Sequence, residues 1–151
     1  MTTREGKGFV YERRITFEDT NVVGNVYFVN YFRWQGHCRE LFMFEHAPEV
    51  ATDVAEGRLR LVTTHSSCDF FEELASFDLV RVHMRLERFV QCGVRLAFEY
   101  RVLGKDDREG DSPCVARGTQ ETKALKKING AWQLAPLPDE LTVAINKVHH
   151  A

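Results

Sequence analysis

The segment that most constrains the fold of this chain is residues 26–46, which is apolar and aromatic almost all round and contains no proline. Apolar side chains recur in it at helical spacing, and a helix that is apolar on most sides is buried on most sides. We therefore expect a long central helix, ended by Pro48 and followed by a short second helix over residues 49–56. Gly36 costs this helix about 1 kcal/mol relative to alanine, so we expect it to pack closely against another backbone.

Segments with alternating polar and apolar residues predict the strands of a sheet. They lie at residues 9–17, 59–72, 77–89, 94–102 and 115–128. The tight connection Gln91-Cys92-Gly93 predicts an antiparallel hairpin between two of them. With a last short helix over residues 139–147, this order predicts an α+β fold, an antiparallel sheet wrapped around one long helix. A single sheet leaves an edge or a face exposed, so we also expect a dimer.

Length and composition fit one globular domain spanning residues 1–151. The formal net charge of −2 gives no indication of nucleic acid or a membrane surface as a partner. The four cysteines form no C-x-x-C pair and the six histidines show no ligand spacing, so we expect no metal site. The sequence contains no signal-peptide core and no apolar run long enough to cross a bilayer, and we expect a cytoplasmic protein.

The turn-forming residues 19–25 lead the chain onto the predicted helix. Because the first amides of a helix lack partners and carry the positive end of its dipole, we expect the amides between Gly24 and Tyr27 to polarise a ligand carbonyl. Asn21 is neither a base nor a nucleophile, but its amide can orient water or a ligand by hydrogen bonds. Alternatively, Asn21 only stabilises the turn. Asp19 is the nearest ionisable group that could act as a base instead.

Arg39 lies about three turns into the predicted helix, on a side that is a poor place for an unpartnered charge. Arginine stays protonated, so it cannot act as an ordinary base, but it can stabilise an oxyanion or bind a carboxylate. The alternative is an ion pair with Glu12, Glu40 or another acid. The sequence has no G-x-S-x-G motif, which together with the predicted topology excludes the α/β-hydrolase fold.

Residues 11–31 resemble the opening of hotdog-fold thioesterases of the 4-hydroxybenzoyl-CoA thioesterase class, which typically read D-T-D-x-x-G-x-V-Y-x-x-x-Y. The matching positions in this chain are Asp19, Thr20, Asn21, Gly24, Val26, Tyr27 and Tyr31. Asn21 stands where the class usually has Asp. Its combination with Arg39 on the helix is similar to the hotdog thioesterases of enediyne polyketide pathways, which belong to antibiotic biosynthesis.

This resemblance implies a thioesterase that releases a polyene, as a β-ketoacyl thioester, from the acyl carrier domain of an iterative polyketide synthase. The β-keto acid can then lose carbon dioxide to leave a methyl ketone or a related polyene. No cofactor is implied, and dimers are expected to pair into tetramers. The expected catalytic residues are Asn21 and Arg39. Asn21 would orient water or the thioester, and Arg39 would hold a β-keto oxygen, an oxyanion or the carboxylate of the product. The residues expected to contact substrate are Gly24, Val26, Tyr27, Tyr31 and Phe32.

Two other functions fit the same residues. A general acyl-CoA thioesterase of the same fold would prefer smaller and simpler acyl chains. A non-catalytic acyl-binding protein would shield a polyene on its synthase, and the replacement of Asp by Asn21 keeps this hypothesis open because loss of the acid often means loss of hydrolysis. Binding of the thioester without turnover would favour it.

Overall fold

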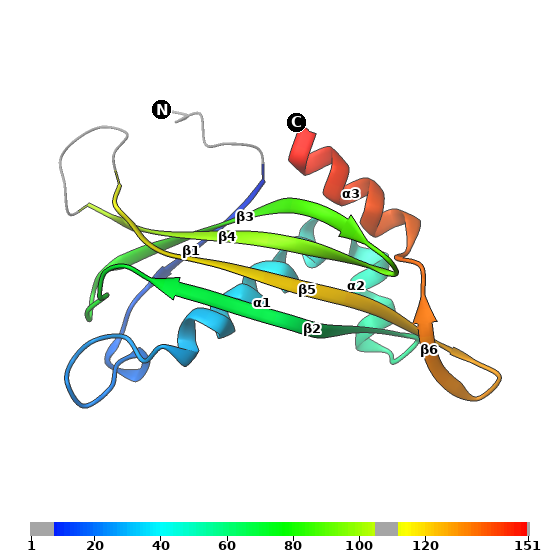
Figure 1. Cartoon of the computed structure of the whole chain (residues 1–151), viewed down its shortest axis with the longest axis horizontal. Helices are drawn as coiled ribbons and strands as arrows, with labels where there is room; N and C mark the ends of the chain where they lie inside the picture. Colours follow the sequence, from blue (N-terminus) through cyan, green and yellow to red (C-terminus); the bar gives the residue numbers. More distant parts are fainter. Residues whose placement is uncertain (1–7, 105–111, 151) are drawn as a thin grey trace.

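The computed structural model describes residues 8–104 and 112–150 of the chain. Its centre is a six-stranded antiparallel sheet in the order β1-β3-β4-β5-β2, with β6 paired to β5 off that path. The strands are β1 (Phe9–Arg14), β2 (Leu59–Phe70), β3 (Leu79–Val90), β4 (Gly93–Leu103), β5 (Cys114–Ile128) and β6 (Ala131–Ala135). The helices are α1 (Val29–His46), α2 (Pro48–Ala55) and α3 (Asp139–His150), with a 3-10 turn η1 (Phe17–Asp19). The sheet curls around α1, which confirms the expected α+β architecture (Figure 1).

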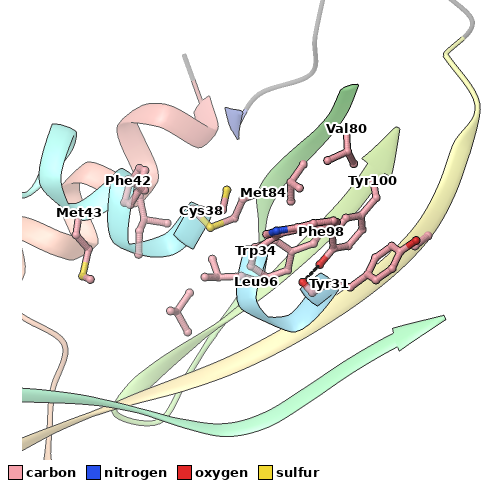
Figure 2. Close-up of a cluster of buried hydrophobic side chains, with 14 of the residues drawn as sticks. Tyr31, Trp34, Cys38, Phe42, Met43, Val80, Met84, Leu96, Phe98 and Tyr100 are labelled. Atoms are coloured by element: carbon pink, nitrogen blue, oxygen red, sulfur yellow. Dashed lines mark hydrogen bonds between the residues drawn. The ribbon is translucent and has the colours of Figure 1, made fainter. Parts of the chain in front are cut away.

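The core lies between α1 and the concave face of the sheet. Trp34 and Cys38 of α1 are almost completely buried against the inward rows of β3 and β4 (Figure 2). Those rows consist of Val80, Val82, Met84, Leu96, Phe98, Tyr100 and Val102. Removing one large apolar side chain of this kind from water contributes about 1.5–3 kcal/mol. The Tyr100 hydroxyl also donates a hydrogen bond to the carbonyl oxygen of Tyr31 at 2.6 Å, which ties the first turns of α1 to the sheet.

The predicted hairpin between β3 and β4 is confirmed. Val90 pairs with Gly93, and Cys92 in the turn between them adopts a φ of 56°. A second hairpin joins β5 to β6 through the turn Asn129-Gly130, a residue pair typical of tight turns. Strand β6 itself was missed because a single one of its five residues is fully buried, so no alternating pattern marks it.

Helix α1 begins at Val29 rather than near residue 26, so the predicted start is wrong by about one turn. The backbone N–H of Val26 donates to the carbonyl of Leu74, and that of Tyr27 donates to the carbonyl of Asp19. Both acceptors lie outside the helix, and these bonds hold the backbone in a strand-like path until Phe28. A local helical pattern could not reveal them because Leu74 is remote in the sequence.

The first strand also ends early, at Arg14 rather than at residue 17. The Asp19 carboxylate accepts a hydrogen bond from the backbone N–H of Thr16, and this local bond competes with continued strand pairing. The chain therefore bends into η1. Phe17, the last residue of the predicted strand, is instead 72% exposed.

The expectation that Gly36 packs against another backbone is wrong. A Cβ atom built at Gly36 would have no atom within 4 Å. The close approach occurs instead at Gly118 of β5, where a Cβ would lie 2.4 Å from Nε2 of Gln35 and 2.5 Å from the carbonyl oxygen of Ser67. The α1 residue that packs against this glycine is Gln35, whose side chain is buried.

Candidate active site

The loop before α1 is built around the carboxylate of Asp19, which is buried. Arg13 donates to it from Nη2 at 2.7 Å and from Nε at 3.3 Å, and the backbone N–H of Thr16 donates at 3.0 Å. Burial alone would raise the pKa of Asp19, but the hydrogen bonds from Arg13 and Thr16 outweigh it and the pKa is lowered. Asp19 is therefore an ionised anchor of the loop, and its engaged oxygens make it a poor candidate for the base.

Asn21 occupies the turn that the sequence predicts. Its side-chain oxygen accepts a hydrogen bond from the backbone N–H of Val23 at 3.0 Å, and its backbone N–H and carbonyl pair with Asn25 and Gly24. This is the geometry of an Asx turn. The side chain is exposed, and its NH2 group has no hydrogen-bond partner among the described residues. The turn role and a ligand-binding role are thus compatible, because they use different atoms of the same amide.

The amides expected to bind a carbonyl oxygen are largely occupied, which corrects the sequence-based assignment. The N–H groups of Gly24, Val26 and Tyr27 all donate to backbone carbonyls. The N–H groups of Phe28 and Val29 have no acceptor within the described part of the chain. They form the true N-terminus of α1, so the positive end of the helix dipole is presented there.

Arg39 is held by neutral oxygen atoms rather than by an acid. Its Nη1 donates to Oε1 of Gln120 at 2.9 Å, to Oγ1 of Thr122 at 3.0 Å and to Oγ1 of Thr63 at 3.2 Å. The predicted alternative, an ion pair with Glu12 or Glu40, is not formed; Glu12 pairs with Arg81. Burial lowers the pKa of Arg39, and the Glu40 charge opposes part of that shift.

The structure does not bring Arg39 to the N-terminus of α1 within one chain. Arg39 follows Phe28 by about three helical turns, so their Cα atoms lie about 16 Å apart along the helix. Arg39 contacts Thr63 in the first half of β2, whereas Phe28 contacts Phe70, the last residue of that strand. A carbonyl at the Phe28 amide and an oxygen at Arg39 of the same chain are thus well separated.

The five residues expected to contact substrate occupy different environments. Val26 and Tyr31 are buried in the core, Phe32 is half-buried, and Gly24 and Tyr27 are exposed. Burial raises the pKa of the Tyr31 phenol, so this side chain stays protonated. Tyr27 remains available to a ligand, because 47% of its surface is exposed beside the free amides.

An apolar pocket lies at the other end of α1, between this helix, the concave face of the sheet and α3. Its free volume is only about 20 Å³, room for about one water molecule, and Arg39 and Thr122 are the two polar residues among those that line it. Its apolar lining includes Phe42, Met43, Leu61, Leu96, Leu141 and Ile145. None of the five expected substrate-contact residues, all of which the structure describes, lines this pocket.

Sequence reasoning missed Gln120 and Thr122, the two β5 residues that hold Arg39. Both are almost fully buried on the inward row of β5, at 4% and 2% exposure. Polar side chains on an inward row are unusual, because burial of a polar group is costly unless it is hydrogen-bonded. That exception to the alternating pattern was the signal that could have identified them.

Residues 15–145 match the family model described as the Thioesterase-like superfamily. The chain belongs to this superfamily. It is 35% identical to the dynemicin thioesterase, whose crystal structures concern polyene binding, over 93% of this chain and 96% of that one, with a TM-score of 0.84. A relative from Aquifex aeolicus (strain VF5), named provisionally as an esterase, is 28% identical over 133 residues, 88% of this chain and 94% of the relative.

A further structure shares the fold. The 1,4-dihydroxy-2-naphthoyl-CoA thioesterase from Synechocystis is 22% identical, with a TM-score of 0.75 over 95% of this chain and 98% of that one. The fold is therefore the hotdog thioesterase fold, and the enzyme is a thioesterase.

The described residues include no group of three or more His, Cys, Asp or Glu side chains that could hold a metal ion. Within the same part of the chain, no helix has the length and hydropathy required to span a bilayer.

Proposed function

We propose that this thioesterase hydrolyses a polyene β-ketoacyl thioester carried by the acyl carrier domain of an iterative enediyne polyketide synthase. The observation that carries the proposal is Arg39, which lines an apolar pocket and whose guanidinium has no carboxylate partner among the described residues. An apolar chain with a polar, oxygen-rich head would suit such surroundings, and the proposal requires the pocket to widen around the chain, because its free volume of about 20 Å³ is too small for a polyene. The similarity to a thioesterase whose structures concern polyene binding supports the same substrate class.

In this mechanism water attacks the thioester carbonyl. The N–H groups of Phe28 and Val29 receive the oxygen on which negative charge develops, as unpartnered amides at a helix N-terminus can do. The free NH2 group of Asn21 orients the thioester or the water. The carbon–sulfur bond breaks, the carrier thiol leaves with a proton, and a β-keto acid remains. Loss of carbon dioxide from that acid gives a methyl ketone.

The separation along α1 implies that one chain does not complete this site. The β-keto carbon is only two bonds from the thioester carbonyl carbon. Its oxygen therefore cannot span the distance of about 16 Å that separates the Cα atoms of Phe28 and Arg39. We propose that the Arg39 acting on a given thioester comes from a second copy. Strand β2 ends the sheet order and offers an unpaired edge. Antiparallel pairing of two β2 edges would also make the two α1 helices antiparallel, so that each N-terminus faces the distal half of the other helix.

The same edge carries exposed aromatic side chains. Phe70 and Phe71 at the end of β2 are about half exposed, and Phe28 packs beside Phe70 with ring centroids 6.5 Å apart. Pairing of the edges would cover part of this apolar surface. We therefore propose a homodimer as the catalytic unit, with a pair of dimers as the expected tetramer.

The proposal is tested by thiol release from two substrates of equal chain length. One is a β-ketoacyl thioester on a carrier-protein arm, and the other is the saturated acyl-CoA. We expect a higher kcat/KM for the β-ketoacyl carrier substrate. A preference for the saturated acyl-CoA would instead indicate a general acyl-CoA thioesterase, and tight binding of both without cleavage would indicate a non-catalytic shielding protein.

A mixing experiment tests the shared site. Arg39→Ala and Asn21→Ala chains are each expected to be weakly active alone. If Arg39 and Asn21 act from different copies, mixed dimers regain one intact site and activity rises on mixing. Failure of mixed dimers, verified by mass, to regain activity would place both residues in the same copy.

A further inference from the structure

The environment of Arg39 is unusual because all of its hydrogen bonds leave from one nitrogen atom. Nη1 alone contacts Gln120, Thr122 and Thr63, and the Thr122 hydroxyl also donates to Oε1 of Gln120 at 3.3 Å. Gln120 and Thr122 come from adjacent inward positions of β5, and Thr63 comes from the neighbouring strand β2. We refer to these three residues as the neutral cradle. It fixes the position of the guanidinium from one side.

The other edge of the guanidinium makes no hydrogen bond, although protein atoms cover its Nε. Nε of Arg39 is buried and has no hydrogen-bond partner among the described residues, and Nη2 donates no bond to any of them either. Nε–H and one Nη2–H point in the same direction and form the fork that binds two oxygen atoms side by side. This fork therefore matches a carboxylate, or the two carbonyl oxygens of a 1,3-dicarbonyl group.

The cradle also leaves the charge of Arg39 uncompensated. Its three members are an amide and two hydroxyls, and Arg39 makes no ion pair with a described carboxylate. A buried charge without a counterion is costly, so a protein optimised only for stability would place an acid here. Glu has the shape of Gln and could occupy position 120 without a change in packing.

From this geometry we propose that Gln120, Thr122 and Thr63 are positioning residues that orient Arg39 while keeping it free to bind paired substrate oxygens. The neutrality of Gln120 is then a specificity determinant, because a carboxylate at this position would take the place of the ligand. The identity of the ligand as a β-ketoacyl group or its β-keto acid rests on the function proposed above. The recognition of two ligand oxygens by the Nε–Nη2 fork does not depend on that function.

The test compares Gln120→Glu with the wild-type enzyme and with Gln133→Glu, which makes the same change on the exposed strand β6. We expect Gln120→Glu to fold with an unchanged or raised Tm, since it adds an ion pair. Its kcat/KM for a β-ketoacyl thioester should fall about tenfold or more, as expected for loss of a charge-assisted contact. Its kcat/KM for the saturated thioester of the same length should change less than about twofold. Equal losses on both substrates would overturn the proposal.

A second variant covers the case in which Gln120→Glu fails to fold. Thr63 is exposed, so Thr63→Asp brings a carboxylate to Nη1 from the surface with little disturbance of the core. It is expected to reproduce the same selective loss. If Thr63→Asp discriminates between the two substrates as the wild type does, the cradle has no influence on specificity.

A binding measurement separates this inference from the proposed function. Calorimetry with octanoate and with 2-octanone compares a carboxylate with an apolar ketone of equal length. The wild type should bind octanoate in preference, and Gln120→Glu should lose that preference by about tenfold. This result is expected even if β-ketoacyl thioesters prove to be poor substrates. Equal affinity of both proteins for octanoate would refute the role of the neutral cradle.

Discussion

The contact between α1 and β5 at Gly118 makes a quantitative prediction for Gly118→Ala. The added methyl carbon would lie 2.4 Å from Nε2 of Gln35 and 2.5 Å from the carbonyl oxygen of Ser67. The carbonyl belongs to a paired strand and cannot move away, so the Gln35 amide must be displaced. That amide donates to Ser67 at 3.1 Å and accepts from the Ser66 hydroxyl at 3.0 Å.

The expected cost follows from these contacts. Overpacking of a tight site costs about 1–3 kcal/mol. Loss of the two Gln35 hydrogen bonds adds about 1 kcal/mol for each. Replacement of glycine in a strand interior returns only about 0.5–1 kcal/mol of backbone entropy. The costs of overpacking and of the lost hydrogen bonds exceed the gain in backbone entropy. We therefore expect Gly118→Ala to lower the free energy of unfolding by about 2–4 kcal/mol.

Urea unfolding followed by tryptophan fluorescence, at one fixed protein concentration, measures this loss. Gly36→Ala is the matched control, because a Cβ there meets no atom within 4 Å. It should stabilise α1 by up to about 1 kcal/mol. In a double-mutant cycle, Gln35→Ala should relieve part of the cost of Gly118→Ala, by about 1 kcal/mol or more. A Gly118→Ala protein within about 0.5 kcal/mol of the wild type would refute the steric argument.

The remaining predictions concern the site. The folded-state pKa of Asp19 lies below its ordinary value of 3.8, so its stabilisation is fully present above that pH and is lost as the pH falls through the lower folded-state value. The Tm difference between wild type and Asp19→Asn should thus be constant above about pH 5 and shrink in more acidic buffer; a pH-independent difference would contradict this. Arg39→Lys should lower kcat/KM for β-ketoacyl thioesters by about tenfold or more, because an ammonium group has no fork, whereas retained activity would argue against paired-oxygen recognition. Asn21→Asp should keep the bond from Val23 and the Tm but lose the NH2 donor and with it activity; unchanged hydrolysis would limit Asn21 to the turn.

The sequence predicted the elements whose pattern is local. Strands β3 and β4 alternate clearly because one face meets α1 and the other carries charged side chains. The start of α1 was misplaced because the backbone amides of Val26 and Tyr27 bond to Leu74 and Asp19, and helical periodicity carries no information on such contacts. Glycine in a helix suggested a close approach at Gly36, but the chain uses a glycine of β5 instead, a choice that only the three-dimensional packing reveals.

The residues of the candidate site also fall into two groups, those with a local signal in the sequence and those defined only by tertiary contacts. Asn21 and Arg39 were identified through a family resemblance, and the turn around Asn21 through its own residue types. The distance between Arg39 and the helix N-terminus could have been worked out from the helical rise alone. The partners of Arg39 could not, because Gln120 and Thr122 are far from it in sequence and meet it only when β5 crosses the helix.

The hydrogen bond from Tyr100 to the Tyr31 carbonyl also has a mechanical consequence. Together with the Asn30 bond to Asp19 and the Gln35 bonds to β2, it clamps the first half of α1 to the loop and the sheet. Beyond Arg39, no side chain of α1 donates or accepts a hydrogen bond with a described residue of the sheet, and the helix rests on apolar side chains alone. Such contacts can slide without breaking directional bonds. We therefore expect the region between α1 and α3 to be the more compliant part of the molecule, so that a ligand could widen the pocket there without moving the N-terminus of α1.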